Sequence, residues 1–95
     1  MVIGTLKVTL YICDNRSLKG KRSVVKSIVA KVHQKFNASV AEVGAHDKWK
    51  MIELGISTVA NDRRFVNSVL DTILTYIDSL YLGEIVDADI EMLNV

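Results

Sequence analysis

Several residue types are scarce in this sequence of 95 residues, and each shortage excludes something. Proline is absent and cysteine occurs once, so turns must rely on Gly, Asn, Asp and Ser, and no internal disulfide can form. A lone cysteine is typical of the reducing cytosol, which predicts a cytoplasmic location. No uncharged apolar run approaches the roughly 18 residues of a membrane span, and the first residues lack a signal-peptide pattern. The sequence therefore predicts neither a secreted protein nor a membrane protein.

The remaining composition fits one folded domain. Hydrophobic residues make up 49% of the chain and charged residues 24%, which are ordinary values for a globular domain. A chain of this length buries roughly 60–65% of its unfolded surface, enough for one core. We therefore expect a single domain over residues 1–95.

The charges are segregated along the chain, although the formal net charge is only +1. No acidic residue occurs between Asn15 and Ala41, a stretch that holds seven of the twelve Lys and Arg. No basic residue occurs from Phe65 to Val95, which holds six of the eleven Asp and Glu. Unpaired local charge attracts counter-charged partners and steers their approach. The first segment therefore predicts an anionic partner.

Alternation of apolar and polar residues predicts strands over residues 2–12, 39–43, 51–60 and 84–93. In the last strand, Val86, Ala88, Ile90 and Met92 are expected to face the core. Apolar residues at three- and four-residue steps predict two helices. The first is capped by Ser17, or begins near Lys21 if Gly20 breaks the first turn. The second follows an N-cap at Asn61 and Asp62, runs to Leu80 and is ended by Gly83.

The element order β-α-β-β-α-β predicts an α+β fold, the ferredoxin-like βαββαβ sandwich. Its antiparallel sheet has the order 4-1-3-2, with two helices on one face. Chain direction then places the loop 14–22, the connection 44–50 and the turn at Gly83 at the same end. Six cations are expected to share this rim with Trp49 and His46, namely Arg16, Lys19, Lys21, Arg22, Lys48 and Lys50.

Several of these segments resemble the YlxP-like family of small bacterial proteins of uncharacterised function. The resemblance is carried by residues 17–27 (SLKGKRSVVKS) and 36–43 (FNASVAEV), by Asp47 and Trp49, and by 54–55 (LG) and 59–62 (VAND). It covers almost the whole chain and implies a ferredoxin-like fold. Relatives are often encoded near translation factors and a ribosome-binding factor, and this association suggests work on the ribosome or on RNA.

The basic rim is the first candidate site, because cations beside a helix N-terminus favour phosphate. Lys26, Lys31 and Lys35 are assigned instead to a solvated helix face. Trp49 is the second candidate: its ring either stacks on a base or partner, or folds back to close the hairpin. The open sheet face offers Tyr11 alone among Glu53, Asp87, Asp89 and Glu91. Since carboxylates repel phosphate, that face is a poor RNA platform.

No catalytic, cofactor or metal constellation is visible. Cys13 ends an apolar strand and is expected to be buried. One Cys and two distant His, His33 and His46, do not make a zinc site. Asp87 and Asp89 point the same way along a strand and are interpreted as an acidic solvent face rather than a cation or acid–base site.

We therefore predict a non-catalytic protein without cofactors that binds RNA or a ribosomal particle through the rim. The alternative is a protein–protein adaptor or homodimeric module without a nucleic-acid partner. A small-molecule enzyme comes third. A homodimer is also expected from the short edge strand 39–43, because exposed edges invite pairing, or from the open sheet face.

Overall fold

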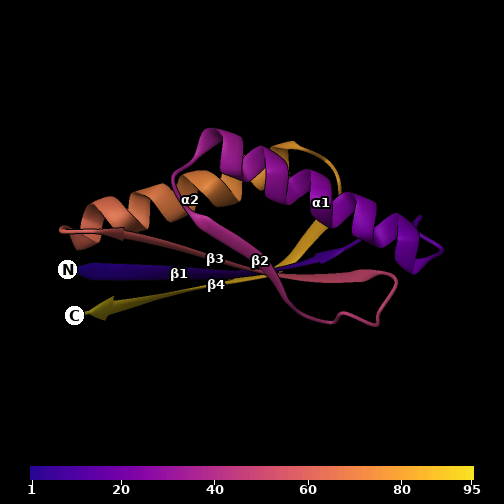
Figure 1. Ribbon diagram of the computed structural model, residues 1–95, viewed down its shortest axis with the longest axis horizontal. Coiled ribbons are helices and arrows are strands. Elements are labelled where there is room, and N and C mark those ends of the chain that lie inside the picture. The colour runs from indigo at the N-terminus through magenta and orange to yellow at the C-terminus, as the bar shows by residue number, and fades with distance from the viewer.

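The computed structural model describes all 95 residues and has four strands and two helices in the predicted order (Figure 1). The strands are β1 (Val2–Tyr11), β2 (Ser39–Gly44), β3 (Met51–Ala60) and β4 (Glu84–Asn94), and the helices are α1 (Leu18–Lys35) and α2 (Arg63–Ser79). All neighbouring strands are antiparallel, in the order β2-β3-β1-β4. This is the predicted 4-1-3-2 order read from the other edge, so the ferredoxin-like α+β fold is confirmed.

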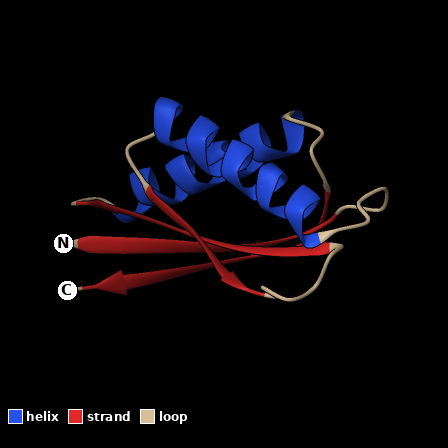
Figure 2. Cartoon of the chain, turned by 45° about the vertical axis from the view of Figure 1, so that its right-hand side comes forward, coloured by secondary structure: helices blue, strands red, loops and turns tan.

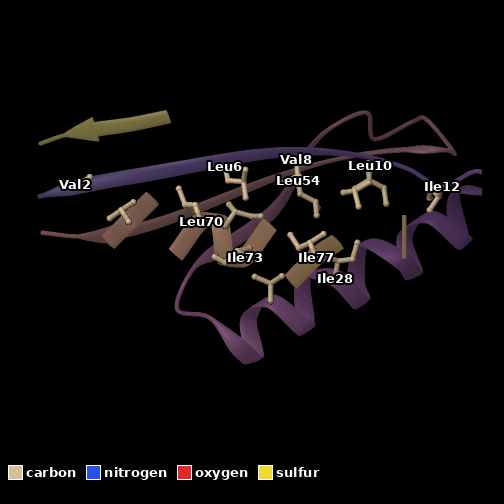
Figure 3. Packing of buried hydrophobic residues seen from close by; sticks show 14 residues of the cluster. Val2, Leu6, Val8, Leu10, Ile12, Ile28, Leu54, Leu70, Ile73 and Ile77 are labelled. Atoms are coloured by element: carbon tan, nitrogen blue, oxygen red, sulfur yellow. The ribbon is translucent and has the colours of Figure 1, made fainter. Parts of the chain in front are cut away.

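Both helices cover the same face of the sheet, and the other face is open (Figure 2). The core fills the space between the two layers, because each central strand turns alternate apolar residues towards the helices. In Figure 3 the side chains of Leu6, Val8 and Leu10 on β1 point towards Leu70, Ile73 and Ile77 of α2 and towards Ile28 of α1. The helix α2 contacts the central strands β1 and β3, whereas α1 lies over the edge strand β2.

The strand β4 carries a β-bulge that the sequence pattern does not reveal. Its pairing with β1 runs from Val2 opposite Asn94 to Thr9 opposite Asp87, and then shifts so that Leu10 lies opposite Ile85. The extra residue is Val86, which is 51% exposed. The prediction that Val86 faces the core is therefore wrong. A bulge reverses the parity of the residues beyond it, so Ile85 packs against the core in its place.

The end of α2 also differs from the prediction. The helix ends at Ser79, and Leu80 is its C-cap. The left-handed residue that follows is Tyr81, with φ of 54°, whereas Gly83 has no positive φ. Gly83 therefore does not end the helix. At the other end, Asp62 occupies the predicted N-cap position, but its side chain makes no capping hydrogen bond.

The approach of α2 to β1 is possible because residue 4 is a glycine. A Cβ at Gly4 would lie 2.2 Å from Cγ1 of Val66 and 2.9 Å from Cδ1 of Leu70. The side chains of Val66 and Leu70 are both fully buried and have little room to move. The glycine therefore fixes how closely the helix layer packs on the sheet.

We expect Gly4→Ala to lower the free energy of unfolding by about 1–3 kcal/mol, because it overpacks the core. The matched control is Gly83→Ala, whose Cβ would meet no atom closer than 3.4 Å and whose φ is not positive. That control is expected to be neutral or slightly stabilising. Urea unfolding of both variants tests this. Equal stabilities would show that the layers are not held at this distance by Gly4.

Candidate functional site

The two basic loops lie at the same end of the molecule, as chain direction predicts. The backbone N–H of Ile12 donates to the carbonyl of Lys50 at 2.8 Å. The side-chain amide of Asn15 donates to the carbonyls of both Ser17 and Trp49. Asn15 thus ties the β1–α1 loop to the β2–β3 connection. In Figure 1 this end lies on the side away from both chain termini.

The helix α1 begins in the first of the two ways considered from the sequence. The hydroxyl of Ser17 accepts a hydrogen bond from the backbone N–H of Gly20 at 3.0 Å, so Ser17 is the N-cap. Gly20 lies inside the helix and does not break it. The first turn of α1 contains no acidic residue. The partial positive charge of the helix N-terminus is therefore added to that of the loop.

Lys21 does not belong to the exposed rim predicted from the sequence. Its side chain is only 2% exposed, and its ammonium lies 3.1 Å from Oε2 of Glu42 on β2. It also donates a hydrogen bond to the backbone carbonyl of Ala45. The contact with Glu42 joins the charges without the alignment of a hydrogen bond, because Oε2 has no hydrogen-bond partner. Lys21 is therefore a buried structural cation, and the prediction that it contacts an anionic partner is wrong.

The buried lysine also shapes the β2–β3 connection. Ala45 has a left-handed backbone, with φ of 55°, at the point where the chain leaves β2. A non-glycine residue in this region is held there by its surroundings. The Ala45 carbonyl accepts hydrogen bonds from the ammonium of Lys21 and from the backbone N–H of Lys48, so the first turn of α1 is tied to the segment that carries Lys48, Trp49 and Lys50.

The other predicted site residues remain together on the surface. Arg16, Lys19, Arg22, Lys48, Trp49 and Lys50 are all exposed, and we call this set the basic rim. The protein's only ion pair is that of Lys21 with Glu42, so none of the five rim cations is paired. Two exposed carboxylates, Asp14 and Asp47, lie in the same loops. The rim thus has an excess of unneutralised positive charge.

The backbone of Trp49 is hydrogen-bonded to the β1–α1 loop. Its carbonyl accepts from Asn15, while the residue is 53% exposed. The ring takes part in no aromatic pair or cation–π contact; the aromatic contacts of the protein are those of Tyr76 with Phe36 and Lys35. Its role as a contact residue stays a prediction. His46 is exposed beside it.

The open sheet face has the opposite charge. The register places Asp87, Asp89 and Glu91 of β4 opposite Thr9, Lys7 and Thr5 of β1, on the face without helices. All three acidic residues are exposed, so the predicted acidic solvent face is confirmed. Phosphate is therefore repelled from the sheet and attracted to the rim.

The structure also places the Cys and His residues that were considered as candidate sites. Cys13 is exposed, which corrects the expectation that it is buried: β1 ends at Tyr11, and the thiol stands in the following turn. His33 is exposed on α1. No group of three or more His, Cys, Asp or Glu is arranged to hold a metal ion. Neither helix is long and apolar enough to cross a membrane.

Two features were missed from the sequence. One is the ion pair of Lys21 with Glu42, because no local sequence pattern connects residues so far apart in the chain. The other is Tyr81, which is 91% exposed. The available signal was an aromatic residue directly after the end of a helix stripe.

The fold and the rim describe a small ferredoxin-like domain with a basic end. Comparison with known proteins adds the family: residues 3–90 match the family described as "Protein of unknown function (DUF503)", and the chain belongs to it. It is 38% identical over 78 residues to the "Uncharacterized protein YlxP" of Bacillus subtilis (strain 168), covering 82% of this chain and 85% of that protein. The resemblance seen in the sequence is thereby confirmed.

Solved structures with similar folds are distant in sequence. The de novo designed protein Foldit4 is 13% identical with a TM-score of 0.53, covering 99% of this chain and 97% of its own. The crystal structure of At3g17210 from Arabidopsis thaliana is 8% identical with a TM-score of 0.50, covering 98% and 94%. At such identities these likenesses show the fold alone.

The ion pair of Lys21 with Glu42 leads to a prediction about the free energy of unfolding. Lys21→Met leaves the carboxylate of Glu42, which is 19% exposed, without its counter-charge. Removing one partner of a buried pair costs about 3–5 kcal/mol. We expect a loss of unfolding free energy towards the lower end of that range. The double variant Lys21→Met/Glu42→Leu should recover most of it, because no buried charge remains unpaired.

The control is Lys19→Ala, an exposed change in the same turn that should cost less than about 0.5 kcal/mol. Denaturant unfolding of the four variants, Glu42→Leu included, completes a double-mutant cycle. A Lys21→Met protein as stable as Lys19→Ala would contradict the buried clamp. So would a double variant that recovers nothing.

Proposed function

We propose that this protein is a non-catalytic RNA-binding protein that binds RNA or a ribosomal particle through the basic rim. The observation that carries the proposal is the gathering of five exposed, unpaired cations on the start of α1 and on two loops that are bonded to each other. Surface cations that stay unpaired are free to bind phosphate and to release its counterions. The acidic sheet face also supports the proposal, because its carboxylates repel a polyanion and leave the basic rim as the surface for binding.

The geometry favours a polyanion over a small anion. The rim residues come from the β1–α1 loop, the first turns of α1 and the β2–β3 connection, so the charge is spread over an end of the molecule. It does not converge in a closed cavity. A chain of phosphates matches such a spread charge, and an exposed indole beside it suits an unstacked base.

The test compares two triple variants that remove the same charge. Arg16→Ala/Lys19→Ala/Arg22→Ala removes three rim cations, whereas Lys31→Ala/Arg63→Ala/Arg64→Ala removes three exposed cations elsewhere on the helices. Filter binding to a single-stranded RNA is measured over a range of salt concentrations. The rim triple should weaken binding most at low salt and reduce the salt slope by up to about two units.

The control triple should change the binding far less, and both triples should keep the stability of the parent. Equal losses from the two triples would show that only total positive charge matters. An unchanged affinity in both would remove the RNA proposal and leave the alternative.

That alternative, a protein–protein or homodimeric module, is favoured by one other observation. Ile3 lies between Val59 on β3 and Leu93 on β4, in one row of the open sheet face. Met1 and Val95 are bonded to each other through their backbones at the end of the same strands. The row lies near the chain termini, at the end opposite the rim (Figure 1). It is an apolar patch that a partner or a second copy would cover.

The two surfaces are separable by experiment. If the apolar row mediates self-association, light scattering at high micromolar concentration should give a dimer mass, and Leu93→Asp should give a monomer without changing RNA binding. A parent protein that is monomeric at that concentration contradicts the homodimer, whether it is formed through this face or through the β2 edge.

A further inference from the structure

Tyr81 stands in a conformation that its residue type disfavours. It follows the C-cap of α2 with a φ of 54°, in the left-handed region, and its backbone N–H donates to the carbonyl of Asp78. This position after a helix usually holds glycine, because a Cβ is unfavourable there. The chain does have a glycine two residues later, but Gly83 has an ordinary φ.

No packing contact offsets this cost. Tyr81 is 91% exposed, the most exposed of the large hydrophobic residues. Its hydroxyl takes part in none of the protein's side-chain hydrogen bonds, and its ring joins no aromatic pair. Tyr81 thus adopts a disfavoured backbone conformation without stabilising the fold, and this points to a role other than folding.

The surroundings of Tyr81 indicate what that role is. Tyr81 lines a hollow of about 600 Å³ between the β1–α1 loop and the α2–β4 turn, a size within the range of ligand sites. Asn15 lines the same hollow and also bonds to Trp49. In the sheet, β3 and β4 lie on opposite sides of β1. The Trp49 segment leads into β3 and the hollow lies at the start of β4, so the two lie on opposite sides of the β1–α1 loop. The hollow and the basic rim share this loop, because Arg16 of the rim directly follows Asn15 in the chain.

The chemistry of the hollow differs from that of the rim. Three carboxylates line it, those of Asp14, Asp78 and Glu84, together with the side chain of Tyr11. Carboxylates repel phosphate but accept hydrogen bonds from amino groups. An aromatic ring beside them stacks on a base of any identity. The hollow thus suits the base of a nucleotide whose phosphate stays on the rim.

From this arrangement we infer that the hollow holds an unpaired RNA base bearing an exocyclic amino group, stacked on Tyr81. The inference rests on the proposed function and adds a preference to it. Cytosine presents an amino donor where uracil presents a carbonyl oxygen, and that oxygen is repelled by the carboxylates. The protein therefore prefers cytidine over uridine in a single strand.

The first experiment separates stacking from stability. Tyr81→Gly relieves the left-handed strain, so its melting temperature rises by a few degrees, roughly 4–8 °C. Its affinity for a cytidine oligomer falls about five-fold or more, since the loss of one stacked base is of that order. Its salt slope stays unchanged, because the ring carries no charge. Tyr81→Phe keeps the ring and keeps the affinity.

The second experiment tests the role of the carboxylates by measuring the ratio of the affinities for a cytidine and a uridine oligomer. Parent protein binds a cytidine oligomer more tightly than a uridine oligomer of equal length. The variant Asp14→Asn/Asp78→Asn/Glu84→Gln binds both more tightly, since repulsion of phosphate is removed, and loses the preference. General electrostatics changes both affinities alike, so only specific contacts with the base alter the ratio.

The outcomes distinguish this inference from the proposed function. RNA binding that depends on the rim but is unchanged in Tyr81→Gly overturns the stacking site and leaves the rim in place. Equal affinity of the parent for the two oligomers overturns the amino-group preference. If no RNA binds the parent at all, the proposed function fails, and the base site fails with it.

Discussion

The arrangement of the basic end depends on one buried ion pair. Lys21 reaches from the first turns of α1 to Glu42 on the edge strand and to the carbonyl of Ala45. These contacts join the first turn of α1 to β2 and to the start of the β2–β3 connection. The pair costs desolvation, and hydrophobic side chains of similar size would serve stability at least as well. The contribution of the pair is structural: it sets the position of the start of α1 relative to the β2–β3 connection, and both carry exposed cations.

The charge of the folded protein is divided more sharply than that of the sequence. The cation of Lys21 is neutralised inside, and the cations of the basic rim remain unpaired at one end. The acidic residues of β4 gather on the open sheet face, where the register brings them beside one another. A polyanion therefore meets attraction at the rim and repulsion at the sheet. An RNA strand would approach this domain end-on, unlike the sheet-face binding of RRM domains.

Most of the fold was predictable because it follows from periodicity. Alternating apolar residues located the four strands, three- and four-residue steps located the helices, and chain direction brought the two basic loops together. The failures have local causes. The bulge at Val86 reversed a parity, and Tyr81 took the left-handed position expected of Gly83. Lys21 looked like its exposed neighbours because its partner, Glu42, lies on a strand 21 residues further along the chain. A tertiary ion pair and a strained aromatic leave no periodic signal.

The central claim is that RNA meets this protein at one end. An NMR titration of the labelled protein with a single-stranded RNA tests it most directly, because every backbone amide reports separately. The account predicts that chemical-shift changes concentrate in the β1–α1 loop, the β2–β3 connection and the α2–β4 turn, with little change along β4 beyond Asp87. Changes concentrated on the open sheet face, or on the apolar row around Ile3, would contradict it.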